Sequence, residues 1–243
     1  MCITITMSNI NVYVTHALYI NLESRTDRRE HVEAQLASLK SNGMPNMAVE
    51  RFNAIKHATS GAIGCSMSHM RCVQIAKERG WDRVLVCEDD VLFTNVPLFL
   101  TQLSKFMATV PRWDMVLLAG NNSPPFQVVN DACVQVSRCQ TTTAYIVQAH
   151  YYDALIANYR AGIQLLMRNP TQKINYAIDR YWFELQRRDR WFLITPLSVV
   201  QREDYSDIEQ CITNYGHLML DLDKQELMRR QMEHVKMQMQ LKK

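Results

Sequence analysis

Three adjacent carboxylates stand where a ligand could be bound. Glu88, Asp89 and Asp90 directly follow the apolar run 83–87, which has the length and composition of a buried strand. In open α/β sheets, ligands bind beyond the carboxyl ends of the strands. A divalent cation relieves the repulsion between neighbouring carboxylates by accepting their oxygens as ligands. The triplet therefore indicates a metal site, although a solvated turn with a capping aspartate would show the same residues.

A basic segment follows the first predicted strand, which spans residues 12–22. Arg25 and Arg28 carry planar guanidinium groups that suit a diphosphate. The alternative is that they pair with the acidic side chains of Asp27 and Glu30 at a helix start. Asp27 and Glu30 have the spacing of a capping box, which predicts a helix that ends near Asn42.

The rest of the chain alternates between predicted strands and helices. Further strands are expected at about 47–54, 113–119, 132–136 and 142–147, and helices at 98–107 and 151–161. Another helix, capped by Ser66 or Ser68, runs to Arg79 and is closed by Gly80. It places His69 in its first turn, where backbone N–H groups favour anions. This alternation is typical of an α/β fold with a largely parallel sheet.

Length, composition and charge exclude several classes of protein. The 243 residues suffice for one sizeable domain, and 47% hydrophobic with 21% charged residues excludes disordered and fibrous chains. A net charge of +3 is too small to indicate a strongly basic surface for nucleic acid, so no nucleic-acid partner is expected. With only 7 glycines, a glycine-rich nucleotide loop is not expected either.

The cysteines and the termini favour a protein of the reducing cytoplasm. The 7 cysteines include no Cys-x-x-Cys pair, and we expect reduced, mostly buried thiols. We recognise no signal peptide at the N-terminus and no apolar run long enough to span a membrane.

The C-terminal residues differ in composition from the rest. We expect one domain over 1–217 and an amphipathic helix over 218–243, with its apolar stripe formed by Met228, Met232, Val235 and Met239. That helix could dock on its own domain, form the seam of a homodimer, or lie on a membrane surface through its basic face.

Several short motifs occur in the order found in one known family. They are Tyr19–Leu22 with Arg25, Asp27 and Arg28; Phe52–Ala54; Gly64-Cys65 with Ser68-His69; Val84–Val91; Trp113-Asp114; Thr143–Tyr145; Asp179; Pro196; Gln201; and Ser206–Ile208. Together they resemble glycosyltransferase family 25, the lipooligosaccharide and procollagen galactosyltransferase family, over roughly residues 10–210. Cys87 departs from the pattern, since the family usually has a larger aliphatic residue there.

The resemblance implies a GT-A type fold that binds a UDP-sugar and a divalent metal, usually manganese, with magnesium as the alternative. By similarity, Asp90 is the expected metal ligand, and Asp89 binds either the metal or the ribose hydroxyls. The residues that the resemblance assigns to the donor are Asn21, Arg25, Arg28, Asn53, His69, Glu88, Asp89 and Gln201.

The resemblance also implies inversion at the anomeric carbon, for which a carboxylate must take the acceptor proton. Asp179 is the first candidate for this base, and Asp207 is the second. The aromatic residues 181–183 could stack on a sugar, but aromatic side chains in an α/β protein more often fill the core.

The sequence thus predicts a metal-dependent transferase that moves galactose or glucose from a UDP-sugar to a glycan or lipid-linked saccharide acceptor. It would work in the cytoplasm, with peripheral membrane association as an option. One alternative is a degenerate member that serves as a scaffold or binding protein, but the intact triplet 88–90 argues against it. The other is a nucleotidyltransferase, which would show a glycine-rich basic loop after the first strand, where residues 23–30 contain no glycine.

Overall fold

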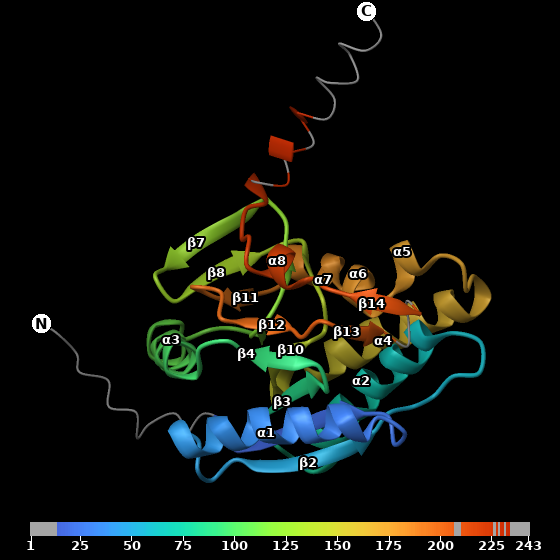
Figure 1. Ribbon diagram of the computed structural model, residues 1–243, viewed down its shortest axis with the longest axis horizontal. Helices are drawn as coiled ribbons and strands as arrows, with labels where there is room; N and C mark the ends of the chain where they lie inside the picture. Colours follow the sequence, from blue (N-terminus) through green and yellow to red (C-terminus); the bar gives the residue numbers. More distant parts are fainter. Residues whose placement is uncertain (1–13, 207–209, 226, 228, 231, 234–243) are drawn as a thin grey trace, which may run out of the picture.

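The computed structural model describes residues 14–206 and 210–225, together with residues 227, 229, 230, 232 and 233. Within this part of the chain the largest feature is an eight-stranded sheet in the order β2-β1-β3-β10-β5-β11-β8-β7 (Figure 1). Its strands are β1 (His16–Asn21), β2 (Ala48–Asn53), β3 (Arg83–Glu88), β5 (Met115–Leu117), β7 (Phe126–Asn130), β8 (Cys133–Val136), β10 (Ala144–Gln148) and β11 (Trp191–Ile194).

The directions of the strands make this a mixed sheet. β1 is parallel to both β2 and β3, and β5 is parallel to β11. β10 is antiparallel to β3 and β5, and β8 is antiparallel to β11 and β7. The predicted α/β class with a large central sheet is confirmed. The parallel order expected for most of the sheet holds across β2, β1 and β3 and between β5 and β11. The other neighbouring pairs are antiparallel, and among them only β7 and β8 are joined by a short hairpin connection.

Helices cover both faces of the sheet. The long ones are α1 (Thr26–Asn42), α2 (Gly61–Glu78), α3 (Val96–Thr109) and α4 (Tyr152–Arg168). The shorter ones are η2 (Ala149–Tyr151), α5 (Lys173–Tyr176), α6 (Ile178–Tyr181), α7 (Phe183–Arg188) and α8 (Gly216–Met219). The helices α1 and α3 pack in one hydrophobic core, and α2 and α4 in the other. Alternate residues of each strand therefore serve opposite cores, as the two-residue period of a strand requires.

Three small two-stranded sheets complete the described structure. They pair β4 (Val91–Phe93) with β12 (Val199–Gln201), β13 (Asp204–Ser206) with β14 (Cys211–Thr213), and β6 (Asn121–Asn122) with β9 (Cys139–Gln140). The first pair is antiparallel and sets Gln201 beside Val91. It thereby carries a distant part of the chain to the residues that follow β3.

The predicted start of α2 is wrong. The helix begins at Gly61, so Ser66 and Ser68 lie inside it and donate to the carbonyls of Ala62 and Gly64 one turn earlier. His69 consequently lies in the middle of α2 rather than in its first turn. The argument that backbone N–H groups at a helix start would aid His69 in binding an anion does not apply.

The predicted capping box of α1 is also absent from the described structure. The N-cap residue is Arg25, whose side chain caps no backbone group of the helix. Asp27 instead receives two hydrogen bonds from the Arg25 guanidinium, at 3.1 and 3.0 Å. An ion pair thus replaces the expected contact of a side chain with the backbone.

Some of the described residues after 210 pack against the rest of the domain. Met219 is fully buried in the core beside α1 and α3, and Asn122 Nδ2 donates to the Leu222 carbonyl at 3.0 Å. Met232 of the predicted apolar stripe is 60% exposed. Met228, Val235 and Met239 lie outside the described residues, as does Asp207.

The described cysteines are free, as predicted. Cys72, Cys87, Cys133 and Cys139 are buried, Cys65 is half-buried and Cys211 is exposed. In the described part of the chain, no helix combines the length and the apolar character needed to cross a membrane.

The first turn of α2 passes very close to the segment before it, and this contact generates a prediction about Gly64. A Cβ at Gly64 would lie 2.3 Å from the Ile55 carbonyl oxygen, which is a severe clash with backbone. Gly64→Ala is expected to lower the free energy of unfolding by about 1–3 kcal/mol in urea denaturation, because overpacking outweighs alanine's better helix propensity.

Gly216→Ala is the matched control, because a Cβ there would meet its nearest neighbour at 3.5 Å, an ordinary contact. If Gly64→Ala proves as stable as Gly216→Ala, α2 does not depend on this close approach.

Candidate active site

The acidic triplet lies where the carboxyl ends of β1 and β3 meet. These strands are parallel with Ile20 beside Glu88, so Asn21 and the triplet reach the same edge of the sheet. β10 runs the other way, and the residues before it therefore arrive at that edge too: the hydroxyl of Thr142 donates to Glu88. The prediction that the triplet ends a buried strand is confirmed.

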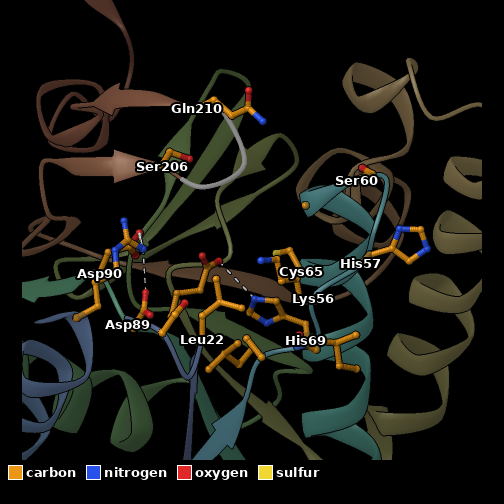
Figure 2. A pocket seen from close by; sticks show the side chains of 18 of the residues that line it. Leu22, Lys56, His57, Ser60, Cys65, His69, Asp89, Asp90, Ser206 and Gln210 are labelled. Carbon is orange, nitrogen blue, oxygen red and sulfur yellow. Dashed lines mark hydrogen bonds and ion pairs between the residues drawn. The ribbon is translucent and has the colours of Figure 1, made fainter. Parts of the chain in front are cut away.

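A pocket of about 760 Å³ opens over this edge (Figure 2). Figure 2 shows Asp89 and Asp90 on one side of it, Cys65 and His69 on the other, and Ser206 and Gln210 beyond them. Its charged and titratable lining residues are Arg28, Lys56, His57, Cys65, His69, Glu88, Asp89, Asp90, Lys173 and Tyr205. Acidic groups and positively charged groups thus share one cavity, which suits a ligand that carries both phosphates and a cation.

Arg28 neutralises the acidic side of the pocket. Its Nη1 donates to Asp89 Oδ1 at 2.9 Å and to Asp90 Oδ2 at 3.3 Å, and its Nε donates to Asp204 Oδ2 at 3.2 Å. Its side chain is only 10% exposed. A buried carboxylate without such a partner would be strongly destabilising. In this arrangement Arg28 is engaged by carboxylates and not directed to a ligand.

Asp204 links the two arginines that follow β1, and sequence reasoning missed it. Arg25 Nη2 lies 3.3 Å from the same oxygen, Asp204 Oδ2, that Arg28 contacts. Although burial acts in the opposite direction, hydrogen bonds from Arg202 and the Tyr205 N–H, together with the charge of Arg28, lower the pKa of Asp204 to about 2. Asp204 is therefore an ionised anchor that holds Arg25 and Arg28 together.

One carboxylate oxygen of Asp90 has no hydrogen-bond partner among the described residues. Gln201 Nε2 donates to Asp90 Oδ2 at 2.8 Å, while Oδ1 is buried and has no hydrogen-bond partner among the described residues. Burial and the charges of Glu88 and Asp89 outweigh the effect of Arg28 and raise the pKa of Asp90 to about 7. A buried carboxylate oxygen without a partner is an available ligand for a cation.

Two further predicted residues position these carboxylates. Asn21 Nδ2 donates to Asp89 Oδ2 at 2.7 Å, so Asn21 holds a carboxylate and does not itself line the pocket. His69 Nε2 lies 3.3 Å from Glu88 Oε1. Burial would raise the pKa of Glu88, but the hydrogen bonds from His69 and Thr142 outweigh it and lower that pKa. Glu88 is therefore kept ionised.

Three of the predicted residues do not line the pocket. Arg25, Asn53 and Asp179 are not among its described lining residues, and Asn53 is exposed and accepts a hydrogen bond from Arg51 at 3.2 Å. Asp179, on α6, accepts the Thr141 N–H at 3.2 Å, and burial raises its pKa.

The expectation that the aromatic residues beside Asp179 fill the core is confirmed for Trp182. Its ring is fully buried and lies edge-on to Trp191, with centroids 5.2 Å apart.

The comparison with family models decides which family this is. Residues 46–164, about half of the chain, match the model of glycosyltransferase family 25 (LPS biosynthesis protein). The chain belongs to glycosyltransferase family 25. The matched segment contains residues 54–61, Cys65, Ser68, His69 and the acidic triplet, which together make up more than half of the lining of the pocket described above.

Curated protein sequences give no match, whereas solved structures give distant ones. A glycosyltransferase involved in the glycosylation of the major capsid of PBCV-1 has 11% identity and a TM-score of 0.49, covering 86% of this chain and 90% of that one. A Drosophila beta-1,4-galactosyltransferase 7 mutant, in complex with manganese, UDP-Gal and xylobiose, has 16% identity and a TM-score of 0.35, covering 58% and 52%. A UDP-glucose pyrophosphorylase in complex with UDP-glucose has 8% identity and a TM-score of 0.44, covering 77% and 75%.

The state of Asp90 generates a prediction about pH. A cation can bind this carboxylate only after its proton leaves, and the raised pKa places that loss near pH 7. Mn²⁺ affinity of this glycosyltransferase is therefore expected to be constant well above about pH 7 and to fall about tenfold per pH unit below it.

Titration of Mn²⁺ by electron paramagnetic resonance at a series of pH values measures this dependence, and Asp90→Asn should remove it. A decline that begins only near the ordinary aspartate value of about 4 would contradict the burial of Asp90.

Proposed function

We propose that this family 25 glycosyltransferase transfers galactose or glucose from a UDP-sugar to a glycan or lipid-linked saccharide acceptor, with inversion and with the help of a divalent cation. The observation that carries the proposal is the buried Oδ1 of Asp90, which has no hydrogen-bond partner in the described part of the chain, in a pocket that also contains Arg28, Lys56 and Lys173. Carboxylate oxygens for a cation and positive side chains for phosphates are the two requirements of a nucleotide diphosphate sugar.

The acidic side of the pocket fits a hard cation. Asp90 and Asp89 offer carboxylate oxygens, which are the ligands that Mn²⁺ and Mg²⁺ prefer. Asn21 and Gln201 hold one oxygen of each carboxylate by side-chain hydrogen bonds, which fixes the orientation of the pair. When bound, the cation would supply Lewis-acid stabilisation of the negative charge on the leaving diphosphate.

The positive side chains would bind the diphosphate. Lys56 and Lys173 line the pocket, and neither was found by sequence reasoning. Arg28 already forms ion pairs with both Asp89 and Asp90. Because two positive charges would arrive with the cation, Arg28 would be released from these carboxylates while its Nε remains on Asp204. Its Nη groups could then donate to phosphate oxygens in the bidentate manner of arginine.

The proton of the acceptor hydroxyl needs a base, and Asp179 remains the first candidate. Burial raises its pKa, which makes its carboxylate a stronger base than an exposed aspartate. The charge of Glu88 adds to this effect, which links Asp179 electrostatically to the pocket edge. Asp207 remains the second candidate and lies outside the described residues.

Asp90→Asn tests the cation site with a side chain of almost the same shape. We expect Mn²⁺-dependent UDP affinity to fall at least about a hundredfold in isothermal titration calorimetry, because loss of even an outer-shell partner weakens metal sites about 10–100-fold. Asp153→Asn is the matched control, since Asp153 is exposed and pairs only with Lys77 among the described residues. An unchanged UDP affinity in a folded Asp90→Asn protein would refute the proposed cation site.

Asp179→Asn tests the base. The variant should keep its affinity for the UDP-sugar and lose at least about a hundredfold in turnover, because general-base catalysis contributes about 10²–10⁴-fold. Donor affinity is measured by calorimetry and turnover by release of UDP, with Asp131→Asn, an exposed aspartate, as control. Turnover near that of the unmodified enzyme would exclude Asp179 and leave Asp207 to be tested.

A further inference from the structure

A second group of potential ligands lies in the wall of the pocket, beside the acidic pair. Cys65 and His69 are four residues apart on α2 and therefore share one face of that helix. Glu88, at the end of β3, faces them. One ligand atom from each of Cys65, His69 and Glu88 lies within 4.8 Å of the others, and all three residues line the pocket.

The chemistry of this cluster differs from that of Asp89 and Asp90. It offers one sulfur, one imidazole nitrogen and one carboxylate oxygen, a mixed set that suits Zn²⁺ better than Mg²⁺ or Mn²⁺. A thiolate and a carboxylate together supply two negative charges, which balance the charge of a divalent ion in this buried place.

The surroundings of the cluster resemble the outer shell of a metal site. His69 Nδ1 lies 3.0 Å from the Tyr145 hydroxyl, and Thr142 donates to Glu88. If Nε2 of His69 is to bind a metal, Nδ1 must carry the proton and donate to the Tyr145 oxygen. A phenolic oxygen has two lone pairs, so the Tyr145 oxygen can accept this bond as well as the one from the Tyr159 hydroxyl at 3.4 Å. Metal-ligating side chains are typically oriented by such hydrogen bonds from neighbouring groups that do not themselves bind the metal.

We propose that Cys65, His69 and Glu88 form a binding site for a zinc-class divalent cation, separate from the cation site at Asp89 and Asp90. Three protein ligands leave one tetrahedral position for water or for a group in the pocket, as in open zinc sites. The proposal goes beyond the sugar transfer proposed above, and Zn²⁺ binding can be measured without any nucleotide or acceptor.

The test is equilibrium dialysis of metal-free protein against Zn²⁺ in the presence of excess Mg²⁺, which occupies hard oxygen sites. One equivalent of Zn²⁺ should bind, and Cys65→Ser should weaken it at least about a hundredfold. Cys211→Ser is the matched control, because Cys211 is exposed and outside the cluster, and its Zn²⁺ affinity should equal that of the unmodified protein. Tyr145→Phe, which removes only the hydroxyl behind His69, should weaken Zn²⁺ about 10–100-fold.

Co²⁺ in place of Zn²⁺ identifies the ligands directly. A thiolate-to-cobalt charge-transfer band in the near ultraviolet is expected for the unmodified protein and for Cys211→Ser, and should be absent from Cys65→Ser. Absence of Zn²⁺ binding by the unmodified protein would overturn the proposal. Equal Zn²⁺ affinity in a folded Cys65→Ser would also overturn it, as would loss of Zn²⁺ in Asp90→Asn with retention in Cys65→Ser, which would place the ion on the acidic pair.

Discussion

The structure around the pocket depends on how three adjacent carboxylates are kept charged or neutral at the end of a buried strand. Burial of an uncompensated carboxylate is prohibitive, and removing one partner of a buried ion pair typically costs about 3–5 kcal/mol. The chain meets this constraint separately at each residue. Glu88 is held ionised by His69 and Thr142, and Asp89 is paired with Arg28 and Asn21. Asp90 keeps one oxygen that no described residue contacts by a hydrogen bond, and its pKa is raised.

This division of roles requires four other parts of the chain to meet beside the triplet that follows β3. The parallel pair β1 and β3 brings Asn21 to the triplet, and antiparallel β10 brings the threonine before it. The β4–β12 pair carries Gln201 to Asp90, and the β13–β14 hairpin carries Asp204 to the arginines. The mixed sheet is thus what makes the site, because a wholly parallel sheet would not start a strand at this edge.

The parts that could be predicted from sequence are those set by local pattern. The apolar run before Glu88 favours a strand wherever the fold buries it. The carboxylates at the end of that strand indicate where the pocket lies. Partners at long range left no local signal: Arg28 and Asp204 are 176 residues apart. Asp204 could have been found only through its place beside the Ser206–Ile208 motif.

Other errors have equally physical causes. Serines suggest a helix start, yet α2 begins earlier because Gly64 allows its first turn to pass against the Ile55 carbonyl, a tertiary contact that outweighs local preference. The strand β7 was not predicted, because it is an edge strand whose Val128 is 67% exposed and whose sequence lacks the alternation of a half-buried strand. Lys56 and Lys173 lie outside any strand end, and only the folded pocket shows them.

The central claim is that the pocket binds a nucleotide diphosphate sugar together with a divalent cation. Its most direct test is thermal unfolding with a panel of nucleotide diphosphates and their sugars, each with and without Mn²⁺, because a ligand that binds only the folded state raises the unfolding temperature. We expect a rise with UDP and with UDP-galactose or UDP-glucose that requires Mn²⁺. No rise with any nucleotide, with or without the metal, would contradict the claim and favour a family member that keeps the fold as a scaffold.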